Sequence, residues 1–251
     1  MAEAKRKIAI VTGGGRGIGR AIVERLRRDG ATVVTCGRGE RPADLPAEVI
    51  WVTGDVSRSD DAKRVAACAA EQGDIAVLVN NAGIQIEKTV TETSDAEWDQ
   101  LVGINCRGVF NMCRAVIPLM AEGGGDIVNL GSISGMVADP SMAIYNASKG
   151  FVHSLTRSVA VDHGPKVRCN AVSPGWIMTE MAESGFALAN DPEKARADSI
   201  ARHPARRFGK PEDVANVVAW LISTESAFVT GHCITIDGGL TAASPLQPGL
   251  F

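Results

Sequence analysis

Near its N-terminus the chain contains the stretch Ile8-Ala9-Ile10-Val11-Thr12-Gly13-Gly14-Gly15-Arg16-Gly17-Ile18-Gly19. The first four residues are apolar, a run too short for a helix and typical of a strand buried in a parallel sheet. Beyond the glycines, apolar residues recur at helical spacing as far as Leu26, with charged residues on the opposite side. Strand, glycine turn and helix in this order let a pyrophosphate approach the N–H groups of a helix N-terminus. A flexible glycine turn without a ligand is the alternative, and the flanking strand and helix argue against it.

The rest of the chain alternates short apolar runs with helical patterns. Strands are predicted at 8–12, 32–36, 50–53, 75–79, 126–130, 166–172 and 232–236. Helices are predicted near 17–29, 60–72, 95–121, 144–163 and 211–223. No linker or internal repeat interrupts the series. The prediction is an α/β fold in one domain over residues 1–251: a single-domain doubly wound (Rossmann-type) parallel sheet of about seven strands with helices on both faces.

Tyr145 and Lys149 are the candidate chemical groups. In Tyr145-Asn146-Ala147-Ser148-Lys149 they stand four residues apart and share one helix face. An ammonium beside a phenol favours the phenolate, so we expect the pKa of Tyr145 to be lowered toward the working pH. Such a tyrosine exchanges a proton with a carbonyl or alcohol oxygen, and Ser132, thirteen residues earlier, would hold that oxygen. The spacing also fits a solvated surface pair, but Tyr145 is the only tyrosine in the chain.

Through these motifs the chain resembles the short-chain dehydrogenase/reductase family, from Ile8 to about Gly239. The glycine spacing Gly13-x3-Gly17-x-Gly19 matches that family rather than the commoner GxGxxG pattern. Further matches in the family's order are Asp55-Val56, Asn80-Asn81-Ala82-Gly83, Asn105, Ser132, Tyr145 with Lys149, Ser173-Pro174-Gly175 and Ile236-Asp237-Gly238-Gly239. The tail from Asp237 to Gly249 is loosely similar to that of glucose 1-dehydrogenases, and 3-oxoacyl reductases are the other subgroup considered.

The resemblance implies an NAD(P)-dependent oxidoreductase that interconverts a secondary alcohol and a ketone or aldehyde by hydride transfer. It implies that Tyr145 is the general acid or base and that Lys149 lowers the pKa of its phenol. Ser132 would orient the substrate oxygen, and the main-chain carbonyl of Asn105 would hold a water in a proton relay. A non-catalytic cofactor-sensing protein is the alternative of another class, because it would need the glycine turn but not these four residues. A lyase or epimerase could use the same tyrosine and lysine.

The predicted cofactor-binding residues combine the glycine turn with loops at several strand ends. They are Gly13, Gly15, Arg16, Gly17, Ile18, Gly19, Gly37, Arg38, Asp55, Val56, Asn81, Ala82, Gly83, Tyr145, Lys149, Pro174, Gly175, Ile177 and Thr179. At the end of the second strand an acidic residue would select NAD, but the chain has Gly37 and Arg38. A guanidinium pairs with a phosphate bidentately, so Arg38 and Arg16 favour NADP(H) over NAD(H). Arg38 could instead be an ordinary surface arginine.

The substrate is the least determined part of the prediction. Residues 176–208, which have few sheet-like runs, match the position of the family's mobile substrate flap. The predicted substrate-binding residues are Ser132, Ser134, Gln85, Asp139 and Trp176. A sugar, polyol or cyclic alcohol is favoured, with a 3-oxoacyl thioester as the alternative. Several basic residues of the flap could bind an acidic substrate, although packing or solvent exposure is the plainer interpretation: Arg196, Arg202, His203, Arg206 and Arg207.

Composition narrows the remaining possibilities. With 251 residues, 45% hydrophobic and 22% charged, the chain can form one large soluble domain. A net charge of −3 gives no basic field, so we expect no nucleic-acid partner. No apolar stretch is long enough to span a membrane, and the apolar run after Lys7 is too short for a signal peptide. The six cysteines are scattered without metal-ligand spacing, which predicts no metal and reduced thiols in the cytoplasm.

Two further features of the helical regions bear on assembly and catalysis. The patterns at 95–121 and 144–163 carry more apolar residues than covering one sheet requires, including Phe110 and Phe151, so a homotetramer is expected by resemblance. His153 lies one turn beyond Lys149 on the same helix face. It is either a catalytic group or, more simply, a residue that packs against the body of the protein.

Overall fold

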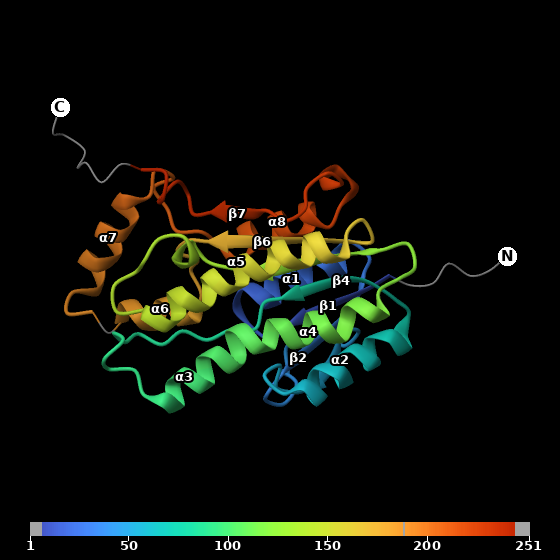
Figure 1. Cartoon of the computed structure of the whole chain (residues 1–251). Helices are drawn as coiled ribbons and strands as arrows, with labels where there is room; N and C mark the ends of the chain where they lie inside the picture. Colours follow the sequence, from blue (N-terminus) through green and yellow to red (C-terminus); the bar gives the residue numbers. More distant parts are fainter. Residues whose placement is uncertain (1–6, 188, 244–251) are drawn as a thin grey trace.

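The computed structural model describes residues 7–187 and 189–243, which form a parallel β-sheet with helices on both faces (Figure 1). The seven strands are β1 (Lys7–Thr12), β2 (Thr32–Gly37), β3 (Ile50–Thr53), β4 (Asp74–Asn80), β5 (Gly125–Leu130), β6 (Val167–Pro174) and β7 (Cys233–Ile236). Their order in the sheet is β3-β2-β1-β4-β5-β6-β7, and every neighbouring pair is parallel. The predicted fold class and all seven predicted strands are confirmed.

The helices divide between the two faces of the sheet (Figure 1). They are α1 (Gly17–Arg28), α2 (Ser59–Gln72), α3 (Asp95–Val102), α4 (Val109–Val116), α5 (Ala143–His163), α6 (Glu180–Ala187), α7 (Pro192–Arg202) and α8 (Pro211–Leu221). Apolar side chains of α2, α4 and α5 pack on one face, and those of α1 and α8 pack on the other. Burying one side chain such as Leu78 or Leu26 contributes about 1.5–3 kcal/mol.

The direction of the chain through the sheet reverses beside β1. The first strands run outward through β2 to β3, and the chain then crosses to β4 on the other side of β1. The loops after β1 and β4 therefore leave from neighbouring strand ends and part to opposite faces. A crevice at such a reversal is where doubly wound sheets bind their ligands.

Two regions differ from the sequence prediction. The helix predicted over 95–121 is interrupted at Gly103–Gly108 by a π-helical turn between α3 and α4, which hydropathy periodicity alone does not reveal. The segment 176–208, in which no helix was predicted, contains α6 and α7 beyond the carboxyl ends of β6 and β7 (Figure 1). The sequence of α7 is mostly polar, so the apolar stripe that identifies a helix is weak there.

Candidate active site

Tyr145 and Lys149 project from the first two turns of α5 toward the end of β5. The Lys149 ammonium lies 5.5 Å from the centre of the Tyr145 ring and donates a 2.8 Å hydrogen bond to the Leu130 carbonyl. Lys149 is buried, and burial lowers the pKa of its ammonium from 10.5 to about 8. The predicted pair therefore shares one pocket, as its helical spacing requires.

The prediction that the pKa of Tyr145 is lowered is wrong for the polypeptide without ligands. Burial raises the pKa of this phenol, and the negative charge of Asp139 raises it further, although a hydrogen bond between the phenol and Ser132 acts in the opposite direction. Lys149 does not reverse the balance, because its ammonium bonds to a backbone carbonyl and is itself penalised by burial. The spacing of the two residues predicted their proximity but not their desolvation.

Ser132 lies in a short loop, residues 131–136, which we call the Ser132 loop. Its hydroxyl accepts a hydrogen bond from the Ser134 backbone N–H at 3.1 Å and donates one to the Ser134 hydroxyl at 3.0 Å. Ser134 in turn donates to the Asp139 carboxylate at 2.6 Å. The three predicted substrate-side residues thus form one hydrogen-bonded chain, and its first member contacts Tyr145.

Asn105 lies inside the π-helical turn and is 2% exposed. Its side-chain amide donates to the Ile84 carbonyl at 2.9 Å and to the Ser148 hydroxyl at 3.1 Å, and its Oδ1 accepts from the Ile84 N–H at 2.9 Å. Ser148 closes the link by donating to the Tyr145 carbonyl at 2.7 Å. Asn105 therefore connects the loop after β4 to the turn of α5 that carries Tyr145. A π-helical turn is a frequent feature of functional sites.

A second buried chain of side chains supports α5 from below. Asn80 donates to Asn129 at 2.8 Å, Asn129 donates to Thr156 at 2.9 Å, and Thr156 donates to the Val152 carbonyl at 2.8 Å. Asn80 belongs to a segment that the family resemblance singled out, whereas Asn129 and Thr156 were not predicted as functional residues. The only signal in the sequence is that two polar residues interrupt otherwise apolar segments.

The glycine turn after β1 is held by its neighbours in a conformation that suits an anion. Gly13 and Gly17 have φ values of +68° and +55°, which residues with a side chain rarely adopt. The Asn81 side chain donates to the Thr12 carbonyl at 2.9 Å, and the Thr12 hydroxyl accepts from the Asn81 and Ala82 N–H groups, both at 3.0 Å. The turn is thereby fixed to the loop after β4.

The start of α1 fits a pyrophosphate. Within the described ranges, no side chain caps this helix at Arg16, and its first turn contains no acidic residue. Its unpaired N–H groups and the positive end of its dipole therefore remain to bind a negatively charged group. Ile18 and Gly19 lie in this first turn, and the Thr179 side chain lies beside Gly17, 3.7 Å from where a Cβ would stand. Predicted residues from both ends of the chain thus surround one anion site.

At the other end of the predicted cofactor site, Trp51 of β3 packs against Gly37, where an added Cβ would come within 2.6 Å of the indole. The sequence reasoning did not include Trp51, which the parallel pairing of β2 with β3 places here. Arg38 follows Gly37 and is exposed. We call Gly37, Arg38 and Trp51, together with Gly15 and Arg16, the adenosine end.

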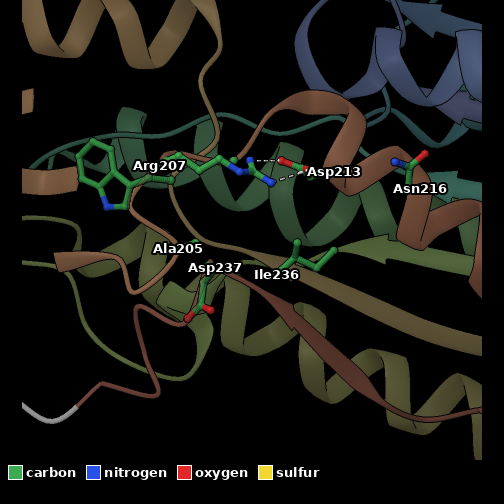
Figure 2. Close-up of a pocket in the computed structure, with 9 residues that line it drawn as sticks. Ala205, Arg207, Asp213, Asn216, Ile236 and Asp237 are labelled. Carbon is green, nitrogen blue, oxygen red and sulfur yellow. Dashed lines mark hydrogen bonds and ion pairs between the residues drawn. The ribbon is translucent and has the colours of Figure 1, made fainter. Parts of the chain in front are cut away.

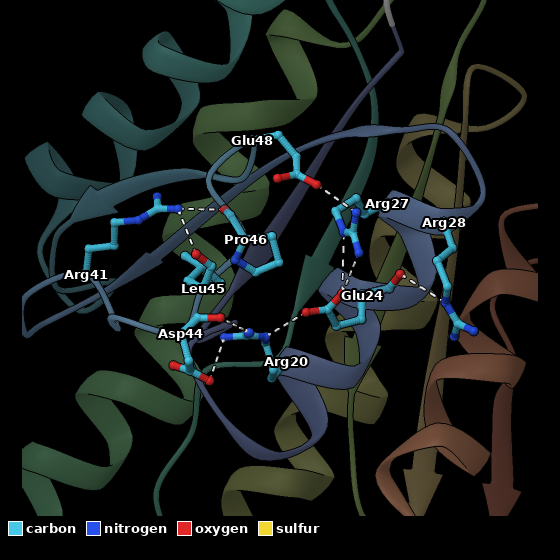
Figure 3. Close-up of polar contacts among 9 residues, drawn as sticks. All are labelled: Arg20, Glu24, Arg27, Arg28, Arg41, Asp44, Leu45, Pro46 and Glu48. Atoms are coloured by element: carbon cyan, nitrogen blue, oxygen red, sulfur yellow. Dashed lines mark hydrogen bonds and ion pairs between the residues drawn. The ribbon is translucent and has the colours of Figure 1, made fainter.

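Other arginines near the adenosine end are bound to the protein itself (Figure 3). Arg20 pairs with Glu24 at 3.0 Å, Arg27 pairs with Glu48 at 2.7 Å, and Arg41 donates to the carbonyls of Val49, Leu45 and Pro46. These contacts fasten residues 38–49 to α1 and to themselves. The side chains of Arg16 and Arg38, by contrast, have no ion-pair or hydrogen-bond partner in the part of the chain that the structure describes.

The remaining predicted cofactor residues line the same edge of the sheet. The Asp55 carboxylate accepts from the Ser57 N–H at 2.9 Å, and Val56 is buried under Gly108. Gly83 lies beside Asn105: a Cβ built on Gly83 would stand 3.3 Å from the Asn105 Oδ1. Pro174 ends β6, Gly175 packs against Asp237, and Ile177 is buried at the base of the flap.

Two cavities border the segment 176–208. One, of about 440 Å³, is lined by Asp139 and Val137 on one side, by Ser199, Arg202 and His203 of the flap, and by Leu240 and Thr241. The other, of about 370 Å³, lies between the flap base and α8 (Figure 2). Among the described residues, the lining of neither cavity includes a predicted catalytic residue, but Ile133 and Asp139 place the first one next to Ser132. Trp176 borders both cavities. Because the first cavity adjoins the chain from Ser132 to Asp139, we take it as the substrate side of the site.

Gln85 is the predicted substrate residue that the structure places neither at a cavity nor in the hydrogen-bonded chain from Ser132 to Asp139. Its side-chain amide donates to the Glu87 carboxylate at 2.7 Å, which turns it toward an exposed neighbour. The prediction followed from its place after the Asn80–Gly83 segment. A position next to a motif does not determine where a side chain points.

The described residues give no sign of a metal site or a membrane span. They contain no group of three or more His, Cys, Asp or Glu side chains that could hold a metal ion. No helix among them is both long and apolar enough to cross a bilayer. Their cysteines are all free thiols.

Comparison with known proteins agrees with this fold. The family described as "Enoyl-(Acyl carrier protein) reductase" matches residues 13–241. The 3-oxoacyl-[acyl-carrier-protein] reductase FabG of Thermotoga maritima is 38% identical over 93% of this chain and 97% of its own. The 2-(S)-hydroxypropyl-CoM dehydrogenase 3 of Xanthobacter autotrophicus is 39% identical, covering 95% and 98%. The ligand-free aldohexose dehydrogenase of Thermoplasma acidophilum has a TM-score of 0.91 and 35% identity, with 97% of both chains covered.

Fold and site together define a nucleotide-dependent oxidoreductase. The chain belongs to the short-chain dehydrogenase/reductase family, and it is an NAD(P)-dependent enzyme of that family. Its reaction is the interconversion of an alcohol and a carbonyl compound, so the reading as a non-catalytic cofactor sensor is set aside.

Proposed function

We propose that the enzyme reduces a ketone or aldehyde to an alcohol, or performs the reverse reaction, with Tyr145 as the general acid or base. The observation that carries the proposal is the convergence of Ser132, Tyr145 and Lys149 at the end of β5, where Ser132 lies close enough to the phenol to lower its pKa. A substrate oxygen placed between the serine hydroxyl and the phenol would be polarised by one and protonated by the other.

The groups around Tyr145 prepare it to act as an acid. Burial and the negative charge of Asp139 raise the pKa of the phenol above its ordinary value, which favours the protonated form that can give its proton to a developing alkoxide. Lys149 would hold the nicotinamide ribose beside Tyr145, and the Asn105 carbonyl would hold the relay water that restores the proton. The nicotinamide, when bound, supplies or accepts the hydride.

For the cofactor we propose NADP(H) rather than NAD(H). The side chains of two arginines at the adenosine end lack a partner among residues 7–187 and 189–243, whereas Arg20, Arg27 and Arg41 nearby are bonded within the protein. A guanidinium without a partner is available for the 2′-phosphate, which it binds bidentately. No carboxylate follows Gly37 at the end of β2, where one would repel that phosphate.

For the substrate we propose a sugar, polyol or cyclic alcohol. The cavity beside Asp139 has residues on both sides that can hydrogen-bond to the hydroxyl groups of a substrate. These residues are Asp139, Ser199 and Thr241. A carboxylate that accepts from a substrate hydroxyl fits a compound rich in hydroxyl groups better than a plain hydrocarbon. The fold similarity to an aldohexose dehydrogenase supports the same class.

A second candidate is a substrate with an anionic tail, such as a 3-oxoacyl thioester. Most basic side chains of the flap are satisfied: Arg196 pairs with Glu183, Arg206 donates to the Ala201 carbonyl, and Arg207 pairs with Asp213 as Figure 2 shows. Arg202, by contrast, has no partner among the described residues and lines the cavity beside Asp139. One unpaired guanidinium in the cavity wall would suit a carboxylate, phosphate or sulfonate.

Three further proposals concern the setting of the site. The segment 176–208 is the substrate flap of a single-domain enzyme over residues 1–251; Leu188 and both termini lie outside the described residues. The enzyme is a homotetramer, which the exposed Phe110 and Phe151 on α4 and α5 support, since such side chains are typical of subunit contacts. It works in the cytoplasm, with no nucleic-acid partner.

The test is a set of initial rates with NADP⁺ and NAD⁺, each with D-glucose, ribitol, cyclohexanol and 3-hydroxybutyryl-CoA, followed by nicotinamide absorbance. We expect the fastest rate with NADP⁺ and a sugar or polyol. A fastest rate with the thioester would favour the second candidate, and Arg202→Gln should then raise the KM for that substrate without changing the rate with cyclohexanol. A fastest rate with NAD⁺ would contradict the cofactor proposal.

A further inference from the structure

His153 is buried, with 4% of its surface exposed, directly behind the Ser132 loop. It follows Lys149 by one turn of α5, as Lys149 follows Tyr145, so the three side chains form one stripe along the helix. Tyr145 contacts Ser132, and Lys149 contacts the carbonyl of Leu130, two residues before it. His153 is the third member of the stripe, and the mechanism above does not use it.

Both ring nitrogens of His153 face polar groups. Nε2 lies 2.8 Å from the Ser173 hydroxyl. Nδ1 lies against Gly135, 2.8 Å from where a Cβ on that residue would stand, and the Gly135 backbone favours a proton on the ring. We therefore assign the proton of the neutral ring to Nδ1, which leaves Nε2 to accept from Ser173. Burial and the neighbouring Lys149 and Arg157 cations lower the pKa of His153, which keeps the imidazole in this neutral form.

The Ser132 loop is in close contact with this ring on either side of Ser132. A Cβ built on Gly131 would lie 2.5 Å from Nε2, and one built on Gly135 would lie 2.6 Å from Cε1. The backbone of the loop therefore rests on the imidazole, and no side chain other than hydrogen fits at these two places. Ser173, the other partner of the ring, directly precedes Pro174 and Gly175 of the predicted cofactor site.

We infer that His153 is a positioning residue: its imidazole joins the Ser132 loop to the end of β6 and thereby fixes the Ser132 hydroxyl against Tyr145. The residue does not touch the substrate or the cofactor in this role. It holds Ser132, which is proposed to orient the substrate oxygen. It also fixes the position of Ser132 relative to the end of β6, where the predicted cofactor residues Pro174 and Gly175 lie. The inference rests on the proposed role of Ser132, and its test is arranged to separate the two.

The single tyrosine of the chain makes the test direct, because phenolate absorbance during a pH titration reports on Tyr145 alone. The hydrogen bond with Ser132 lowers the pKa of this phenol, so its loss in Ser132→Ala should raise that pKa. We expect His153→Leu to raise it in the same direction, while Asp139 and Lys149, which also face the phenol, are unchanged. The titration uses the full chain without substrate.

Kinetics provide the second readout, with the fastest substrate among D-glucose, cyclohexanol and 3-hydroxybutyryl-CoA. A misplaced orienting group should lower kcat of His153→Leu by about 10- to 100-fold, with a smaller effect on KM. Thr156→Val is the matched control: Thr156 is also buried on α5 and hydrogen-bonded, but it touches neither Ser132 nor Tyr145. It should lower the melting temperature without changing the pKa of Tyr145.

Two milder variants test the inference if His153→Leu does not fold. Ser173→Ala removes one partner of the ring, and His153→Gln keeps a donor for the Gly135 carbonyl; each should shift both readouts in the same direction by less. If Ser132→Ala shifts the pKa and kcat but none of the His153 and Ser173 variants does, the inference is overturned and the proposed function stands. If Ser132→Ala itself changes neither quantity, the proposed role of Ser132 fails, and the inference fails with it.

Discussion

At the catalytic end of the cleft the polar side chains are buried and bonded to one another, whereas at the adenosine end the arginines predicted to bind phosphate are exposed. Ser132, Ser134 and Asp139 form a continuous chain, and Lys149 is fixed to the Leu130 carbonyl. Arg16 and Arg38 have no partner within the described residues. The side chains proposed for the chemistry are thus ordered before ligands arrive, whereas the two arginines proposed to select the cofactor would be ordered by the cofactor.

This contrast has an energetic reason. A general acid must stand within hydrogen-bond reach of the substrate oxygen, and a displacement of about 1 Å costs up to about 100-fold in rate. A phosphate contact made by a long side chain on the surface tolerates more freedom, and the cost of ordering it appears in affinity rather than in turnover. Variants at the catalytic end should therefore change kcat, and variants at the adenosine end should change KM for the cofactor.

The largest effect is expected from Tyr145→Phe. The substitution removes only the hydroxyl, so the fold and cofactor binding should persist while proton transfer is lost. We expect kcat to fall by about 10²- to 10⁴-fold, the usual contribution of a positioned acid or base. Turnover is measured by nicotinamide absorbance, and NADPH binding by fluorescence serves as the control for folding. Full turnover by this variant would place the chemistry elsewhere.

The burial of the catalytic end also predicts how stability depends on pH through Lys149. Its pKa is about 8 in the folded chain and 10.5 unfolded, so between these values the unfolded state binds more protons. Stability from this group therefore rises as pH increases from about 8 to about 10.5, and the penalty of burying the charge is complete below about pH 8. The difference is at most about 3–4 kcal/mol, from about 2.5 pKa units at about 1.36 kcal/mol each.

Lys149→Met should remove this slope. Urea denaturation of the cofactor-free protein at several pH values between about 7 and 10.5 measures it, as the difference between wild type and variant. Lys63→Met, an exposed lysine on α2, is the control and should leave the slope unchanged. Equal slopes in the wild type and Lys149→Met would mean that the ammonium is not desolvated, and the contrast between the two ends would weaken.

The same contrast explains how far the sequence alone could lead. Strands and the glycine turn follow from local periodicity, and the proximity of Tyr145 and Lys149 follows from helical spacing, so all of these were predictable. The partners of Asn129, the bond from His153 to Ser173 and the packing of Trp51 on Gly37 join residues far apart in sequence, and no local pattern encodes them. The direction of the Tyr145 pKa shift was mispredicted because it depends on burial, which exists only after folding.

At the adenosine end the main prediction concerns Arg38→Asp. A carboxylate after Gly37 would repel the 2′-phosphate of NADP and accept hydrogen bonds from the ribose hydroxyls of NAD. We expect the ratio of kcat/KM for NADP to that for NAD to fall by about 10- to 100-fold, which corresponds to about 1.4–2.7 kcal/mol. Lys63→Asp makes the same change of charge away from the site and should leave the ratio unchanged. An unchanged ratio in Arg38→Asp would refute the assignment to NADP.

The smallest effect is expected from Arg41→Ala, which tests whether the loop that carries Arg38 is held in place beforehand. Arg41 bonds to three backbone carbonyls of residues 45–49, so its removal should loosen this loop without touching the cofactor (Figure 3). Binding of NADP would then have to immobilise the Arg38 side chain, which costs about 0.5–1.5 kcal/mol of binding free energy. We therefore expect KM for NADP to rise by about 2- to 10-fold. We expect kcat to be unchanged. Arg28→Ala is the matched control, because among the described residues the Arg28 side chain donates only to the Glu24 carbonyl of its own helix. A loss of kcat in Arg41→Ala would show that the two ends are coupled, and the contrast between them would no longer hold.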